Sequence, residues 1–480
     1  MPVKHLQINF SPKTQPLAHQ IEAIEYVKTH DIVPLFDEQG LGKTKMIIDA
    51  LNANIQQKRI DSILVICKKT LLKNWNDEVV KHSYLFPVIL TGSKNQKGRS
   101  LLTYGHYYIA NYEAVVSEIE LLKLMMRDRK FAIVLDESHR IKNPYSKAAE
   151  AIFSLKDLSV KRIIISGTPI ANKPEDIWSQ FYFLDGGITF GEDYEAFKKE
   201  YSVDLRGRDD FSGYNEKMEY LNGKINEVSI RRTKEILQLP DKEFIDVYVD
   251  LPDEHQRVYD VIKRELTVEI ESIDGNDLLS NIDNYLVKLL RLTQVASNPR
   301  LLFENFTQES GKIIALDTLV KSIIERDEKA IIWTSFRKNV KELKGRYSIH
   351  GTRTLFGEMS IDDRNRSVKD FLTRPDVRLL IANPSAAKEG LTLTSANNAI
   401  YLDRTFKMDD YLQSQDRIHR ISQTRKCSIY KIIAKNTIDL YTDEILEKKE
   451  TLAKYILGDT NSLEMKSKCL TKDDLIRIMG

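Results

Sequence analysis

Residues 32–45 read IVPLFDEQGLGKTK, an apolar run followed by two acidic residues and then by glycines, a lysine and a threonine. The run at 32–36 is typical of a buried strand, and residues 45–55 (KMIIDALNANI) have the pattern of a helix. A turn between the two brings backbone N–H groups, a helix N-terminus, an ammonium and a hydroxyl to one point, through Gly40, Gly42, Lys43 and Thr44. This combination predicts a site for the β- and γ-phosphates of ATP, with Thr44 reaching Mg²⁺. A plain Gly-rich turn is the alternative.

The acidic opening of the turn departs from the general phosphate-loop motif, which has glycine where this chain has Asp37. Asp37 and Glu38 precede the N–H cradle, so we expect them to face another lobe or to shape the loop. Lys43 and the helix start then supply the positive field.

A second acidic pair follows the apolar strand in FAIVLDESHRIKN, residues 131–143. At the carboxyl edge of a parallel sheet, Asp136 is placed to hold Mg²⁺ through water, and Glu137 to orient and deprotonate the attacking water. A solvated turn or a helix cap is the alternative reading of two carboxylates at a strand end.

The whole chain predicts an α/β protein with two parallel-sheet lobes. At 480 residues it suits two or three domains. Short β-branched runs alternate with helical periodicity; they lie at 32–36, 62–67, 107–110, 131–136, 162–166, 329–336, 377–383, 398–404 and 427–433. Charged helical stretches dominate 186–310. We therefore predict a first lobe at 1–240, in which a helical insertion starts after 186, and a second at 241–480, which begins with the rest of that insertion at about 252–308.

Composition limits the classes of function. The apolar fraction is 42%, and no apolar run approaches the roughly 20 residues of a membrane-spanning helix. The amino end lacks the apolar core of a signal peptide, and three cysteines without paired spacing argue against disulfides and zinc. These features favour the cytoplasm. With 72 basic and 70 acidic residues, a nucleic-acid partner would be bound in a local groove.

The second lobe offers arginines in QSQDRIHRISQ, residues 413–423. On a helix, Gln413, Arg417 and Arg420 lie on one face. Arginines supplied by a neighbouring domain stabilise the charge that develops on the γ-phosphate during hydrolysis. The alternative is a basic surface helix that pairs with Asp416 or other acids.

Nine segments in this order resemble the Swi/Snf-type ATPases, the DNA-translocase branch of superfamily two helicases: DEQGLGKT, LVICKKTLLKNWNDEV, DESHRIKN, SGTPIANKPEDIWSQFYFL, RRTKEILQLPDK, LTQVASNPRLL, GEMSIDDRNRSVKDF, GLTLTSANNAIYLDR and QSQDRIHRISQ. The resemblance covers roughly residues 15–450. It implies two RecA-like lobes with ATP in the cleft between them and duplex DNA across both.

The resemblance also assigns roles in the first lobe. Gln20 is similar to the glutamine that reads adenine, with an exposed helix residue as the alternative. Ser166, Gly167 and Thr168 resemble the motif that couples hydrolysis to lobe movement. The positions that match family contacts to DNA, here and in the second lobe, are Lys68, Lys69, Thr70, Asn111, Arg364 and Thr394; Tyr112 falls in a comparable place.

Gly390 lies in the motif that touches both DNA and nucleotide, with a plain turn as the alternative. Lys388 and Glu389 replace the small residues usual before it. Arg231 and Arg232 match residues that the family uses structurally and for coupling. Apolar neighbours at helical spacing mark Trp75 and Trp178 as core residues.

The leading functional prediction is an ATP-driven motor that moves along double-stranded DNA with little regard to sequence. The alternatives are a strand-separating helicase, an RNA-polymerase-recycling factor, or a partner-gated ATP switch in a DNA defence or repair complex that involves an unidentified protein. LPDKEF, residues 239–244, resembles a metal-nuclease carboxylate string only faintly.

Overall fold

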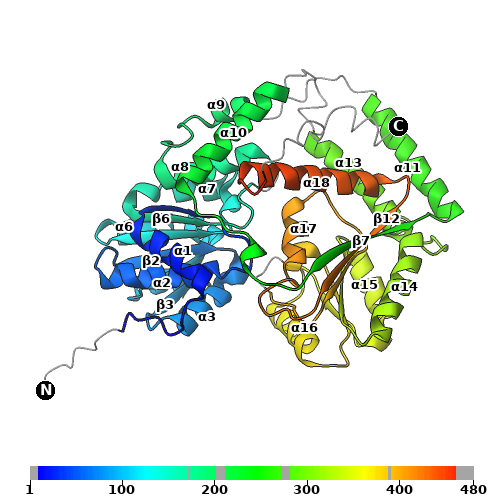
Figure 1. Cartoon of the computed structure of the whole chain (residues 1–480), viewed down its shortest axis with the longest axis horizontal. Helices are drawn as coiled ribbons and strands as arrows, with labels where there is room; N and C mark the ends of the chain where they lie inside the picture. Colours follow the sequence, from blue (N-terminus) through cyan, green and yellow to red (C-terminus); the bar gives the residue numbers. More distant parts are fainter. Residues whose placement is uncertain (1–8, 171–172, 202–210, 272–281, 388–390, 461–480) are drawn as a thin grey trace. The chain divides into compact units, whose positions relative to one another are not determined.

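The computed structural model describes residues 9–170, 173–201, 211–271, 282–387 and 391–460. These residues form two units; in Figure 1 the first is mainly blue to green, and the second runs from green through orange to the red helix near the C-terminus. The first lobe contains the described residues up to 201, with 211–237 and 452–460. The second lobe contains the described residues from 238 to 451. Gly390 and its neighbours Lys388 and Glu389 lie outside the described residues.

The first lobe is built on a six-stranded sheet in the order β1-β6-β5-β2-β4-β3, in which every pairing is parallel. Its strands are β1 (Ile32–Leu35), β2 (Ser62–Cys67), β3 (Pro87–Leu90), β4 (Tyr107–Asn111), β5 (Phe131–Asp136) and β6 (Ser159–Ile165). Parallel neighbours need crossover connections. The helices of this lobe are α1 (Ala18–Thr29), α2 (Lys43–Gln56), α3 (Leu72–His82), α4 (Lys94–Leu102), α5 (Tyr112–Ser117), α6 (Ile119–Arg127), α7 (Lys147–Phe153), α8 (Trp178–Asp185), α9 (Tyr194–Tyr201) and α10 (Phe211–Val228).

The central strands of this sheet are buried on both faces. Every residue of β2 is buried, which agrees with its uninterrupted apolar sequence. One face forms a core with residues of α1, α2 and α3, including Val27, Ile47 and Trp75. The carboxyl ends of β1 and β5 meet at the same edge of the sheet, so the residues that follow them are brought together.

The outer edge of β1 is covered by a chain segment from after α10. Ile230 donates its N–H to Pro34 O (3.0 Å) and accepts from the N–H of Phe36 (2.9 Å). The N–H of Glu38 donates to Arg232 O (2.9 Å). This pairing is parallel, so the residues after Ile230 run beside the loop that follows β1.

The second lobe has its own six-stranded parallel sheet, in the order β7-β12-β11-β8-β10-β9. The strands are β7 (Lys242–Val249), β8 (Ala330–Trp333), β9 (Arg353–Leu355), β10 (Leu379–Ala382), β11 (Asn398–Tyr401) and β12 (Cys427–Ala434). The helices are α11 (Asp253–Glu271), α13 (Ile282–Ser297), α14 (Gly311–Glu325), α15 (Arg337–Arg346), α16 (Ile361–Thr373), α17 (Met408–Gln415) and most of α18 (Ile438–Ile456).

A buried carboxylate ties the end of α13 to this second sheet. Asp403 follows β11 and is 2% exposed. It accepts hydrogen bonds from Ser297 Oγ (2.9 Å), Thr334 Oγ1 (2.6 Å), the Ser335 N–H (2.6 Å) and Asn339 Nδ2 (3.4 Å). All four donors are neutral, and they come from α13, α15 and the turn after β8.

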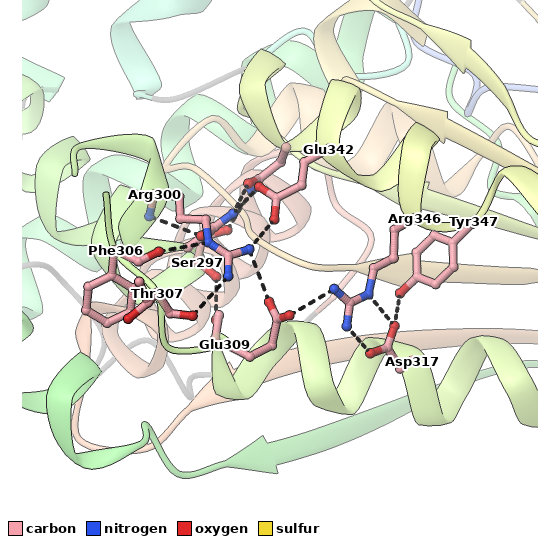
Figure 2. A network of polar contacts seen from close by, with 12 residues as sticks. Ser297, Arg300, Phe306, Thr307, Glu309, Asp317, Glu342, Arg346 and Tyr347 are labelled. Carbon is pink, nitrogen blue, oxygen red and sulfur yellow. Dashed lines mark hydrogen bonds and ion pairs between the residues drawn. The ribbon is translucent and has the colours of Figure 1, made fainter. Parts of the chain in front are cut away.

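A more exposed charged network fastens the same region to α14 and α15 (Figure 2). Arg300 pairs with Glu342 (2.7 Å) and Glu309 (3.5 Å). Glu309 also pairs with Arg346 (3.0 Å), which in turn binds Asp317. Glu309 therefore lies between two arginines and joins the loop before α14 to the end of α15.

These sheets confirm the predicted α/β fold with two parallel-sheet lobes. The strands that the sequence did not predict are β3, β7 and β9, and each lies at an edge of its sheet. β7 alternates between partly buried and exposed residues, β9 has only three residues, and β3 lies within the apolar run 85–90, which was not predicted to be a strand. The described residues include no helix long and apolar enough to cross a membrane.

Candidate active site

The loop after β1 has the backbone geometry of a phosphate cradle. Gly40 and Gly42 have φ angles of +96° and +84°, a region that favours glycine. A Cβ on Gly42 would lie 2.3 Å from Gln20 Nε2, so a larger residue would displace the Gln20 amide from the loop. Gln20 donates to Leu41 O (3.1 Å), which places this predicted adenine-reading residue directly on the loop. Lys43 then begins α2 and Thr44 follows it in the first turn.

The Lys43 ammonium lies inside this loop. It donates to the carbonyl oxygens of Asp37 (2.6 Å) and Glu38 (3.1 Å). Burial lowers the pKa of Lys43, while the carboxylates of Asp37, Glu137 and Asp136 oppose that shift. The ammonium therefore lies within the electrostatic reach of both acidic pairs that the sequence singled out.

The acidic opening of the loop is explained by arginines almost two hundred residues later in the chain. Asp37 is 0% exposed and forms a bidentate ion pair with Arg232. Arg232 also donates to His19 O, so it joins the loop to α1. Glu38 accepts a hydrogen bond from the Lys234 N–H (2.7 Å). Both acids thus shape the loop, which is one of the two roles expected for them.

Arg231 precedes Arg232 and contacts Phe36, the residue before Asp37. Its Nη1 donates to Phe36 O (2.7 Å), and its Nε donates to Asp459 (2.7 Å) in a bidentate ion pair. The segment that carries Asp459 is also held by Asn222, whose amide donates to Tyr455 O (2.8 Å). Arg231 and Arg232 therefore have structural contacts, in agreement with the role that the family resemblance gives them.

Asp136 ends β5 beside the loop. Burial, and next the charge of Glu137, raises the pKa of Asp136 to about 6. Trp75 donates from its indole Nε1 to Asp136 Oδ2 (2.8 Å) and thereby fixes one carboxylate oxygen. Trp75 is 1% exposed, so it is a core residue as expected, but its N–H serves the site as well.

Glu137 has a strained backbone, with φ at +54° in a residue that is not glycine. Tyr112 supports this turn, because its hydroxyl donates to Asp136 O (2.9 Å). The Glu137 carboxylate lies 3.4 Å from His139 Nδ1 and is mostly buried. The turn thus presents one carboxylate bound by Trp75 and a second beside a histidine.

The predicted coupling motif lies next to the loop. The Thr168 N–H donates to Ser166 Oγ (3.1 Å). A Cβ on Gly167 would lie 2.9 Å from Gln39 Cγ and 3.6 Å from Lys43 Nζ, so only glycine allows this close approach. The structure therefore brings Ser166, Gly167 and Thr168 together with the loop.

Gln180 is a site residue that sequence reasoning did not find. It is 0% exposed, accepts from Ser138 Oγ (2.6 Å) and donates to Pro169 O (2.7 Å). It thus connects the turn after Glu137 to the coupling motif. The only signal in the sequence is a polar amide within the apolar run WSQFYF.

The first-lobe residues predicted to contact DNA lie at the same edge of the sheet. Lys68, Lys69 and Thr70 follow the carboxyl end of β2, and Asn111 ends β4. Lys68 is close enough to Asp136 to oppose the rise in the pKa of that carboxyl. Asn111 donates from Nδ2 to Glu113 Oε2 (2.5 Å).

The second lobe gathers its predicted residues around the segment after the undescribed Gly390. Arg417, which is 1% exposed, donates to Leu391 O (3.2 Å) and to Gln413 O (2.8 Å). Arg420 donates to Thr392 Oγ1 (3.1 Å), and burial lowers its pKa. Gln413 is 1% exposed, and its amide atoms have no hydrogen-bond partner among the described residues.

Two other predicted second-lobe residues make local contacts. Thr394 Oγ1 lies 2.9 Å from Ser422 Oγ, which links the segment after Gly390 to the arginine-bearing one. Arg364 donates to Ala386 O (2.7 Å), so its guanidinium is turned toward the chain that precedes Gly390. Arg364 thus contacts the chain before Gly390, and Thr394 belongs to the chain after it.

The residues of the first lobe fit a nucleotide and Mg²⁺. Two glycines with positive φ, the N-terminus of α2 and a buried ammonium suit phosphate oxygens. Thr44 and Asp136 supply the oxygen donors that Mg²⁺ prefers. Among the described residues there is no cluster of three or more His, Cys, Asp or Glu side chains that could hold a metal ion.

Comparisons with known proteins place the chain in a family. The model of the SNF2-related domain matches residues 19–301, and that of the helicase conserved C-terminal domain matches residues 311–422. An uncharacterized ATP-dependent helicase of Mycoplasma genitalium is 28% identical over 466 residues, which are 92% of this chain and 42% of that protein. The chromatin-remodeling complex ATPase ISW2 of Saccharomyces cerevisiae is 26% identical, over 92% of this chain and 40% of that protein. The chain thus spans about two fifths of the length of these relatives.

Among solved structures, the SWI2/SNF2 ATPase core of Sulfolobus solfataricus in complex with double-stranded DNA is 27% identical, with a TM-score of 0.45 over 98% of this chain and 97% of that one. The SNF2-related model alone matches more than half of the residues. The nine segments, the two parallel-sheet lobes and this match agree: the chain belongs to the SNF2-related family of helicase-like proteins.

Proposed function

We propose that the chain is a DNA-dependent ATPase that hydrolyses ATP to ADP and phosphate and moves along double-stranded DNA. The observation that carries the proposal is the convergence of Lys43, Asp136 and Glu137 at one edge of the first sheet, where all three influence one another electrostatically. A lysine for phosphate, a carboxylate for a hydrated cation and a carboxylate for water are the parts that phosphoryl transfer to water requires.

In this proposal each residue has a defined task. The loop N–H groups and Lys43 bind the β- and γ-phosphates. Glu137 accepts a proton from the attacking water, and Arg417 and Arg420 stabilise the charge that develops on the γ-phosphate, with Gln413 beside them. Mg²⁺, held through Thr44 and Asp136, would neutralise phosphate charge. Gln20 is proposed to recognise adenine, and Gly390 to lie near the nucleotide.

The proposed DNA contacts are mostly to phosphates, through Lys68, Lys69, Thr70, Asn111, Arg364 and Thr394. The solved core named above is in complex with double-stranded DNA, and we propose the same class of partner for this chain. Contacts of this type predict an affinity that falls steeply with salt and depends little on sequence. Ser166, Gly167 and Thr168, which touch the loop, are proposed to transmit the state of the nucleotide to the rest of the motor.

The test is steady-state ATP hydrolysis without nucleic acid and with duplex DNA, single-stranded DNA or RNA. We expect duplex DNA to stimulate hydrolysis most, and Glu137→Gln to reduce it by at least about a hundredfold because the proton acceptor is lost. Glu120→Gln is the matched control, since that glutamate is 82% exposed in the same lobe. A triplex-displacement assay then tests movement along the duplex.

Other results would change the proposal. Equal stimulation by single strands or RNA would favour strand separation. Hydrolysis that no nucleic acid stimulates would contradict the motor and favour a switch gated by a protein partner. Wild-type activity in Glu137→Gln would remove the proposed catalytic assignment.

A further inference from the structure

An aromatic patch lies at the edge of the first-lobe sheet opposite the candidate active site. We define the aromatic patch as Tyr84, Phe86 and Tyr104, whose exposed fractions are 48%, 65% and 66%. These residues precede β3 and β4, at the amino ends of the strands. The phosphate loop follows the carboxyl end of β1, and all strands are parallel, so the two features lie at opposite ends of the strands. A ligand of the patch would therefore leave the predicted ATP and DNA contacts of this lobe free.

The rings of the patch are held by defined neighbours. Phe86 stacks on His106 with ring centroids 6.3 Å apart and planes inclined by 26°. Tyr104 meets the same imidazole edge-on at 5.2 Å, and Arg129 lies over the Tyr104 ring at 5.5 Å. Burial, followed by the charge of Arg129, lowers the pKa of His106, so an uncharged ring supports both exposed ones at neutral pH. Because these neighbours already order the rings, stacking a ligand on them costs little side-chain entropy.

The surroundings of the patch are positively charged. The loops before β2 and β5, residues 57–61 and 128–130, together contain four Lys or Arg residues and two Asp residues. Hydrogen bonds join the first residue of β2 and the loop before β5 to the loop before β4: Ser62 Oγ and Arg129 Nη2 both donate to Gly105 O, at 3.2 and 3.4 Å. Lys13 adds a further cation, 4.6 Å from the ring centre of Tyr84.

We propose that the aromatic patch binds single-stranded nucleic acid, with bases stacked on Phe86 and Tyr104 and phosphates attracted by the cations of the adjoining loops. Proteins that hold single strands without sequence preference combine these two features, because every base has a face that can stack. A duplex keeps its bases within the helix and cannot use the rings. The site would act without ATP hydrolysis and independently of the proposed motor activity.

The experiment measures binding of a short fluorescein-labelled oligothymidylate to the full chain by fluorescence anisotropy, at low salt and without nucleotide. The test variant combines Phe86→Ala with Tyr104→Ala, and a conservative variant combines Phe86→Tyr with Tyr104→Phe, so that both rings are retained. Tyr220→Ala is the matched control, since Tyr220 is 56% exposed in the same lobe and also has a lysine, Lys224, over its ring.

We expect the double alanine variant to bind oligothymidylate at least about fivefold more weakly than the wild type, as loss of base stacking predicts. The conservative and control variants should bind as the wild type does, and ATPase activity and duplex affinity of the double alanine variant should be unchanged. No oligothymidylate binding by the wild type, unchanged binding by the double alanine variant, or an equal loss of duplex binding would each overturn the proposal.

A protein ligand is the competing occupant, because Leu102, two residues before Tyr104, is 88% exposed and suits an apolar partner. The same titration separates the two. If the wild type fails to bind oligothymidylate, the stacking site is wrong and the patch is left as a protein-binding surface.

Discussion

Each lobe contains a buried aspartate two residues beyond the end of a strand, and the two are bound in opposite ways. Asp37 follows β1 and pairs with the charged Arg232, which comes from just after α10. Asp403 follows β11 and is bound by neutral donors, among them Ser297 at the end of α13. Both contacts fasten a helical segment to the carboxyl edge of a sheet. A buried aspartate can therefore be stabilised in two ways. In the first lobe an arginine neutralises the aspartate that shapes the phosphate loop, and in the second lobe neutral donors bind the aspartate that holds the end of α13 to the sheet.

The largest effect is expected from Asp37→Ala. Arg232 would remain mostly buried, with a side-chain exposure of 11%, and among the described residues it would keep as an ionic partner only the exposed carboxylate of Glu22, 3.9 Å away. Removing one member of a buried ion pair costs about 3–5 kcal/mol. Urea unfolding followed by tryptophan fluorescence, together with hydrogen exchange of β1, measures the loss and locates it in the first lobe.

The double variant Asp37→Leu with Arg232→Met is its control. Replacing both charges by apolar groups should restore much of the stability, because the uncompensated charge is gone. If the double variant is no more stable than Asp37→Ala, the packing of the loop rather than the charge balance holds Arg232 in place.

Asp403→Asn should lower the free energy of unfolding by less, about 2–3 kcal/mol. The asparagine amide keeps one acceptor oxygen, but its NH₂ group faces hydrogen-bond donors. The same unfolding measurement applies, with hydrogen exchange followed in β8 and β11. Asp376→Asn serves as the exposed control, since the side chain of Asp376 is 61% exposed. A loss as large as that of Asp37→Ala would show that charge is not what distinguishes the two lobes.

Trp75→Phe tests whether the indole N–H of Trp75 orients the Asp136 carboxylate. The ring stays in the core, but the hydrogen bond to Asp136 is lost, so the Mg²⁺ concentration needed for half-maximal ADP binding should rise roughly tenfold. Calorimetric titration of ADP at several Mg²⁺ concentrations measures it without turnover. Trp178→Phe is matched, because that indole donates to Gly191 O (3.1 Å), a backbone oxygen; an equal change there would contradict a specific role for Trp75.

Asp136→Asn differs from the other substitutions because it should stabilise the first lobe. Burial and Glu137 raise the pKa of Asp136 from 3.8 to about 6, so the ionised carboxylate is disfavoured in the folded lobe. Wild-type stability therefore falls as the pH rises from about 4 through 6, whereas the uncharged amide is unaffected. At pH 8 the variant should gain up to about 3 kcal/mol, because a pKa raised by roughly two units is worth about 1.4 kcal/mol per unit. A gain that persists unchanged at pH 4 would exclude titration of Asp136 as its cause.

Much of the fold could be predicted because central parallel strands are apolar on both faces. The run 62–67 announced β2, and the run 131–136 announced β5 with its terminal aspartate. At the sheet edges, β7 alternates between partly buried and exposed residues and β9 has only three residues, so neither has the long apolar run of a central strand, whereas β3 lies in the apolar run 85–90 and was missed. The phosphate loop itself was visible as a local motif, because its glycines, lysine and helix are neighbours in the chain.

The contacts that complete the candidate site could not be predicted in this way. The bond between Asp37 and Arg232 spans 195 residues, and that between Trp75 and Asp136 spans 61. Periodicity identified Trp75 as core but says nothing of where an indole N–H points. Gln180 looked like one polar residue in an apolar helix, and only the assembled loops show that it bridges Ser138 and Pro169.

The separation of 195 residues between the loop and its arginine also has a consequence during protein synthesis. At the usual 5–20 residues per second, a ribosome adds Arg232 roughly 10–40 s after Asp37. All six strands of the first sheet are made before that moment, since β6 ends at Ile165. The nascent lobe can therefore assemble its sheet while Asp37 still lacks its counter-charge, and we expect the phosphate loop to become ordered on the ribosome only after the sheet.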